Sequence, residues 1–130
     1  MSSRYSVEVE YFAERHFVKK FQKKYKNAWT ITWQAIIEEL KRIDSLLDSS
    51  MAETIVGDDN RRIIKTEFRI AKTQQSRHGS GNRCIIAVHQ DIQVVYVLLV
   101  YHKPDLGKGN ETAKLKQIIK KNYKQYKDLF

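Results

Sequence analysis

The residues with the clearest chemical capacity are cations beside three strand-like apolar runs in the second half of the chain. These runs span 63–71, 83–89 and 92–101. Arg69 lies near the end of the first run, Arg83 opens the second, and Lys103 follows the third. If the strands pair as antiparallel neighbours, Arg69 and Arg83 come close together. Two adjacent guanidiniums need an anion between them, and their fork geometry matches a phosphate, so the pattern predicts a phosphate-binding surface. The alternative is that Arg69 pairs with Glu67 or another carboxylate as ordinary surface charge.

Three further cations extend this predicted surface. Lys65 shares the parity of Arg69 in the first run, and Lys72 and Arg77 belong to the polar loop 72–82 that follows. Glycines at 79 and 81 would let the loop backbone approach a phosphate closely. The loop lacks the Gly-Lys-Ser/Thr ending of a nucleotide-binding loop, and a plain hairpin loop is the competing interpretation.

Tyr101 and His102 stand at the end of the third run, beside Lys103. All three side-chain types can take part in proton transfer, so these residues are candidates for a general acid. The alternative is a solvated imidazole at the end of a strand. The four histidines have no metal-ligand spacing, and the single cysteine, Cys84, excludes a Cys-based zinc site or an internal disulfide. We therefore expect no metal and no cofactor, and we expect Cys84 to be a buried small apolar residue.

Length and charge set broad limits. The 130 residues predict one domain, 1–130. The formal net charge of +9 favours a polyanionic partner such as a nucleic acid. The first residues lack an apolar signal core, and no apolar run approaches the roughly 20 residues of a membrane helix. The expectation is a soluble, cytoplasmic protein without a membrane partner.

Hydrophobic periodicity predicts the remaining elements. The first helix is expected to bury a stripe of Phe17, Val18, Phe21 and Tyr25, and the run 94–100 is apolar on both alternating faces, which indicates a central strand covered on both sides. The expected order is a half-buried strand at 5–12, a helix ending near 26–27, a helix from about 29 to 47, a surface loop at 48–60, the three strands, and a helix from about 111 to 127. The segregated order β-α-α-β-β-β-α indicates an α+β fold with a small, antiparallel-rich sheet, two N-terminal helices on one face and a C-terminal helix. The lysines of the last helix are either phosphate contacts or a solvated face, and the solvated face is slightly favoured.

Short motifs in this half of the chain resemble the RelE/HigB-like toxins of the RelE/ParE superfamily. The matching segments are Glu67-Phe68-Arg69-Ile70-Ala71, Gly81-Asn82-Arg83-Cys84-Ile85-Ile86 and Tyr101-His102-Lys103. The element order matches as well, whereas the first half of the chain agrees in element order alone. The resemblance implies a RelE-like fold throughout 1–130.

What the resemblance implies is a toxin of a type II toxin–antitoxin pair, held by a cognate antitoxin. Many members enter the ribosome and cleave mRNA without a metal, by attack of the 2′-hydroxyl on the adjacent phosphate. By matching position, Arg83 would stabilise the transition state and Arg69 would hold the phosphate. Lys103 would contact the backbone or assist the leaving group, with Tyr101 and His102 as further candidates.

The chain also departs from that pattern. Ala71 occupies one place where ribonuclease members often carry a base, and Pro104 replaces an arginine that follows the lysine in some members. A general base is therefore not identified from the sequence. The alternative interpretation is a non-nuclease member of the same fold, either a ParE-like gyrase inhibitor or an inactive RNA-binding relative. A binder of acidic proteins or membrane surfaces through the last helix is a third, poorer option.

Overall fold

The structure, a computed structural model, describes residues 4–130. Its N-terminal part is mostly helical and consists of β1 (Ser6–Val9), α1 (Tyr11–Ala13), the π-helical turn η1 (Glu14–Val18), α2 (Lys19–Tyr25), α3 (Asn27–Leu40) and α4 (Ile43–Leu47). The remaining strands and the C-terminal helical elements follow: β2 (Ala52–Gly57), β3 (Arg61–Phe68), β4 (Asn82–His89), β5 (Val94–His102), the 3₁₀ turn η2 (Lys103–Leu106), α5 (Glu111–Asn122) and the 3₁₀ turn η3 (Lys124–Leu129).

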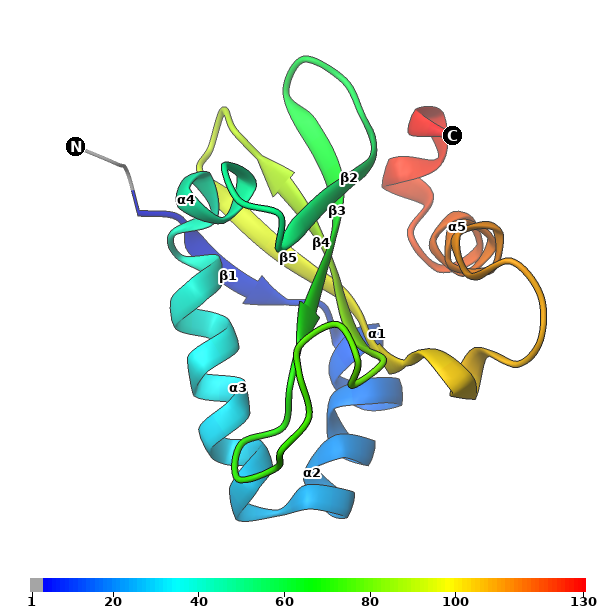
Figure 1. Ribbon diagram of the computed structural model, residues 1–130. Coiled ribbons are helices and arrows are strands. Elements are labelled where there is room, and N and C mark those ends of the chain that lie inside the picture. Colours follow the sequence, from blue (N-terminus) through cyan, green and yellow to red (C-terminus); the bar gives the residue numbers. More distant parts are fainter. Residues whose placement is uncertain (1–3) are drawn as a thin grey trace.

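The five strands form one sheet in the order β1-β5-β4-β3-β2. β1 runs parallel to β5, and the other three pairings are antiparallel. The N-terminal helices pack against one face, and α5 lies on the opposite side of the sheet (Figure 1). The architecture is α+β with a mostly antiparallel open sheet and helices from both ends of the chain, as the sequence predicted.

The N-terminal helices cover their face of the sheet with an aromatic cluster. The ring of Phe21 in α2 stacks 4.8 Å from that of Trp29 in α3, and Phe68 at the end of β3 packs edge-on at 5.7 Å from Phe21. The chain reverses between α2 and α3 at Lys26, whose φ of 53° lies in the left-handed region. Of the predicted stripe, Val18 and Phe21 are buried, and Phe17 and Tyr25 are half-buried.

A second core lies between the sheet and the C-terminal elements. Leu115 and Ile119 of α5 are fully buried there against β4 and β5. The hydroxyl of Tyr123 donates to the Leu98 carbonyl at 2.7 Å, which fixes the end of α5 on the sheet. Asn110 caps the other end, its side chain accepting from the Ala113 amide. β5 is thus covered on both faces, as its unbroken apolar run predicted.

One strand was not expected. Residues 52–57, placed in the predicted surface loop, form β2 on the edge of the sheet. A bulge between Thr54 and Val56 breaks the two-residue alternation, and the strand is half-exposed, so the hydrophobic pattern is weak. The sheet therefore has one more strand than the predicted order allows.

Other boundaries also differ. The predicted helix 29–47 divides at Lys41–Arg42 into α3 and α4. The predicted helix 111–127 ends at Asn122 because Tyr123, with φ of −130° and ψ of 77°, leaves the helical backbone region. β3 ends at Phe68 rather than at 71. The turn after β4 spans four residues, 90–93, rather than two, because Gln-Asp is a poor two-residue turn pair and Gln93 takes a positive φ.

Candidate functional site

Arg83, the central residue of the predicted site, is a buried cation at the start of β4. Its side chain is only 4% exposed and lies on the same face as α5. Nη1 donates to the Asn82 carbonyl at 3.3 Å, whereas Nε is buried without a hydrogen-bond partner. A buried guanidinium with an unused donor is costly, and an incoming anion would satisfy it. Arg83 is therefore a buried cation with one N–H donor left for an anionic partner.

Glu111, the first residue of α5, closes the site. Its Oε2 lies 3.5 Å from Arg83 Nε and accepts a hydrogen bond of 2.7 Å from the Tyr101 hydroxyl. Its Oε1 lies 4.0 Å from Lys103 Nζ. Burial, and then the hydrogen bond to Glu111, raise the pKa of Tyr101 above its usual range, so its hydroxyl stays protonated. One carboxylate thus occupies the point where three predicted site residues meet.

Glu67 approaches Arg83 from β3. The register of the sheet places the two residues opposite each other, and Glu67 Oε2 lies 3.8 Å from Arg83 Nη1. The Nδ1 of His78, in the loop after β3, lies 2.9 Å from the same carboxylate oxygen. A carboxylate beside a buried arginine and an exposed imidazole is chemically suited to take a proton.

Arg69 was predicted to lie beside Arg83, but it lies outside this cluster. It follows the end of β3 and lines a separate hollow, together with Thr32 and Ile36 of α3. The anions beside Arg83 are Glu67 and Glu111, so the predicted pair of arginines around one anion is not the arrangement found among residues 4–130. The strand ends too early to keep Arg69 in the ladder with β4.

The three predicted nucleic-acid contacts do not share an ion pair with Arg83 among residues 4–130. Arg77 forms a two-pronged ion pair with Glu39 of α3, at 2.8 and 3.0 Å, which ties the loop to the helix. Lys65 Nζ lies 3.3 Å from Glu53 on the edge strand. Lys72 is exposed in the loop, with a positive φ. Arg77 and Lys65 thus have carboxylate partners in this structure, and the Arg77 pair ties the loop to α3.

His102 ends β5 directly after Tyr101, so its side chain lies on the opposite face of the sheet from the Arg83 cluster. Its Nδ1 lies 3.1 Å from the Asn82 side-chain oxygen. Gly81, with φ of +75°, lets the imidazole pack against the backbone, because a Cβ there would lie 3.2 Å from the ring. The Lys103 amide donates to the Gly81 carbonyl at 2.7 Å, which holds the ends of β4 and β5 together.

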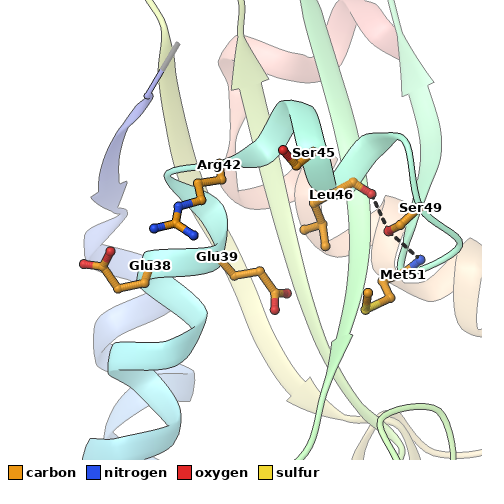
Figure 2. A pocket seen from close by; sticks show the side chains of 7 residues that line it. All are labelled: Glu38, Glu39, Arg42, Ser45, Leu46, Ser49 and Met51. Atoms are coloured by element: carbon orange, nitrogen blue, oxygen red, sulfur yellow. Dashed lines mark hydrogen bonds between the residues drawn. The ribbon is translucent and has the colours of Figure 1, made fainter. Parts of the chain in front are cut away.

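Cys84 and a hollow away from Arg83 contribute none of the predicted site chemistry. Burial raises the pKa of the Cys84 thiol to about 12, which makes it inert, as expected. No group of three metal-ligating side chains occurs among residues 4–130, and within this range no helix is long and apolar enough to cross a membrane. A hollow of about 470 Å³ between α3, α4 and the start of β2 contains none of the predicted site residues (Figure 2). Inside it, the Ser49 hydroxyl donates to the Leu46 carbonyl at 2.7 Å and accepts from the Met51 amide.

Comparison with known proteins supports the fold. The structure is similar to a chain of the archaeal RelE-RelB complex from Pyrococcus horikoshii OT3, with a TM-score of 0.55 and 16% identity over 84% of this chain and all of that chain. No protein-family model matches, and no curated protein matches by sequence. The fold is therefore RelE-like, and the likeness at this identity concerns the fold alone.

Sequence reasoning missed the two glutamates of the cluster. Glu67 was considered only as a surface partner of Arg69, although antiparallel pairing of the two strands with a slightly longer loop places it opposite Arg83. Glu111 lies 28 residues beyond Arg83 in the chain, and the sequence contains no local signal for their contact. Only the docking of α5 over the sheet brings it there.

Proposed function

We propose that the protein is the toxin of a type II toxin–antitoxin pair and cleaves mRNA on the ribosome without a metal. The observation that carries this proposal is Arg83: a buried guanidinium with an unpartnered Nε, next to Tyr101 and Lys103 at the sheet end where the family pattern places its site. The RelE-like fold supports the proposal, and so does the RelB partner of the archaeal neighbour, since a cognate antitoxin is expected here too.

The chemistry is a transfer of the phosphoryl group within the RNA strand. The 2′-oxygen attacks the neighbouring phosphorus, the bond from phosphorus to the 5′-oxygen breaks, and a 2′,3′-cyclic phosphate remains. Arg83 stabilises charge on the non-bridging oxygens, and the protonated Tyr101 hydroxyl donates to one of them. Glu67 takes the 2′-hydroxyl proton, and Lys103, whose Nζ lies 4.0 Å from Glu111 at the site, protonates the departing 5′-oxygen.

The closed arrangement has a consequence for this mechanism. Arg83 is 4% exposed, and the Glu111 carboxylate lies where a phosphate would bind. The substrate phosphate must therefore replace Glu111, which requires a shift at the start of α5. Gly107 and Gly109, both with positive φ, lie in the connection just before this helix. They give that connection backbone freedom for a small displacement.

The test is induced expression in a bacterial host, followed by primer extension on a translated message. Wild type is expected to stop growth and cut the message at discrete in-frame sites, and Arg83→Ala is expected to do neither. Arg61→Ala is the matched control, because Arg61 pairs with Asp58 and Asp128 at the other end of β3. Circular dichroism on the purified variants establishes that both fold.

Two results would replace the proposal. Growth arrest with intact message would favour a gyrase-directed member of the same fold. Neither arrest nor cleavage by a folded wild-type protein would leave an inactive RNA-binding relative. If Arg83→Ala does not fold, Arg83→Lys takes its place, because lysine keeps the charge but loses the fork that holds two phosphate oxygens.

A further inference from the structure

The whole net charge of the protein resides in two helical segments. Residues 11–26 carry six lysines and arginines against one carboxylate, Glu14, and residues 111–129 carry six lysines against Glu111 and Asp128. The rest of the chain holds twelve basic and twelve acidic side chains, so the formal net charge of +9 comes entirely from these segments. Two strongly basic segments separated in sequence indicate a polyanion site only if they lie side by side.

These segments do lie side by side, and a groove of about 450 Å³ separates them. Its floor is apolar and half-buried, formed by Phe12, Phe17 and Ile118. Its rims are exposed and polar, and they consist of His16, Lys20, Gln117, Lys121 and Asn122. The His16 ring lies 4.7 Å from that of Phe12, which leaves an exposed aromatic surface beside the lysines.

The groove continues toward the proposed active site. Lys20 also lines a second, smaller hollow, whose other members are Phe21, Lys24, Tyr25, His102 and Asp105. Lys24 Nζ lies 5.3 Å from the centre of the Tyr25 ring. His102 in turn contacts Asn82, the residue before Arg83. A chain of cations and aromatic rings therefore leads from α5 to the end of β5.

We propose that this groove binds the phosphate backbone of a single RNA strand and directs it toward the cleavage site. Lysines on the two rims suit successive phosphates, and the rings of His16 and Tyr25 suit base stacking. An acidic peptide would use the lysines but not the aromatic surfaces. The only carboxylate lining either hollow is Asp105. The direction of the strand rests on the proposed function, whereas the binding itself does not.

The test is fluorescence anisotropy with a labelled 2′-O-methyl oligouridine, which cannot undergo 2′-hydroxyl attack. The groove variant is Lys20→Glu with Lys121→Glu. The matched control is Lys23→Glu with Lys127→Glu, which makes the same charge change at exposed positions of the same two segments outside the groove. The groove variant is expected to bind roughly tenfold more weakly than the control, and its salt slope is expected to fall by roughly 1.4, the value for two lost single-strand phosphate contacts.

Three results would overturn the proposal. Equal losses of RNA affinity in the two variants would show that the positive charge acts without regard to position. Wild-type affinity in the groove variant would show that the groove does not bind RNA. Stronger loss of polyglutamate binding than of RNA binding would identify an acidic protein as the partner. Lys20→Gln with Lys121→Gln replaces the groove variant if charge reversal unfolds it. Because this RNA is not cleaved, an inactive protein that still binds it through the groove refutes the proposed function and leaves this inference standing.

Discussion

At the scale of single residues, Arg83 is flanked by two carboxylates, whereas the sequence predicted a second arginine, Arg69, beside it. Glu67 and Glu111 neutralise a charge that would otherwise be costly to bury. Neither contact is a hydrogen bond, since Nε lies 3.5 Å from Glu111 without forming one and Nη1 lies 3.8 Å from Glu67. These contacts therefore offset the cost of burying the arginine, and they are weak enough for a phosphate to replace one of the carboxylates.

Glu111→Gln tests whether this carboxylate competes with substrate. The amide keeps the volume and removes the charge, so cleavage of mRNA on programmed ribosomes is expected to rise about fivefold, equivalent to about 1 kcal/mol of lost competition. The matched control is Asp128→Asn, which removes a carboxylate from the same C-terminal region at the Arg61 pair and is expected to leave the rate unchanged. A lower rate in a folded Glu111→Gln protein would instead make Glu111 part of the catalytic machinery.

At the scale of elements, the ends of β4 and β5 position the site, and Gly81 is the residue that joins them. Its carbonyl accepts from the Lys103 amide, and its positive φ leaves room for the His102 ring. A side chain here meets both an unfavourable backbone conformation and a rigid neighbour. The joint between the two strands is therefore expected to be sensitive to a single methyl group.

Gly81→Ala is expected to destabilise the protein by roughly 1–2 kcal/mol in urea unfolding, since alanine pays for the left-handed backbone and also displaces His102. Gly107→Ala is the matched control. Gly107 has a similar φ of +83°, but the nearest atom to its added Cβ is the flexible end of Lys114, at 3.4 Å. Equal losses in the two variants would mean that only the backbone conformation matters and that the His102 contact contributes nothing.

Hydrophobic periodicity predicted the fold class, the two buried faces of β5 and the apolar stripe of α2, because each depends on local pattern. It did not predict β2, whose bulge and exposure erase the alternation. It placed Arg83, Tyr101 and Lys103 in one site, and they share a contact through Glu111. It also placed Arg69 and Arg77 there, but the early end of β3 and the Glu39 ion pair take them elsewhere. Contacts that depend on helix docking have no local signature.

At the scale of the whole molecule, the sheet separates two cores, and its C-terminal cover is tied down by polar contacts at both ends. Near the start of α5, Glu111 contacts the site, and at the far end Arg61 binds both Asp58 and Asp128. Between them, the His89 Nε2 lies 2.7 Å from the Tyr126 hydroxyl. Opening at Glu111 can therefore occur while the remainder of the cover stays attached.

These contacts give the unfolding free energy a two-stage dependence on pH. Burial lowers the pKa of His89, so the unfolded state binds a proton more readily, and stability is expected to fall as pH drops below the ordinary histidine pKa of about 6.5. Hydrogen bonds from the Arg61 backbone and side chain lower the pKa of Asp58 to about 2, so its contribution is lost only below about pH 4.

His89→Gln is expected to flatten the first stage and leave the second. The measurement is urea unfolding between pH 7.5 and pH 3, with His16→Gln, a substitution of an exposed histidine, as the control. An unchanged first stage in His89→Gln would show that this histidine does not couple protonation to folding.

The chemistry of the cleaved RNA ends tests most directly whether Arg83 supports cleavage by 2′-hydroxyl attack. Purified wild type is incubated with programmed ribosomes and mRNA, and the 3′ ends of the fragments are analysed, with Arg83→Lys and Arg61→Ala measured alongside. We expect 2′,3′-cyclic phosphate ends from wild type and Arg61→Ala, and little or no cleavage by Arg83→Lys. Fragments ending in a 3′-hydroxyl, or equal cleavage by Arg83→Lys, would contradict this mechanism.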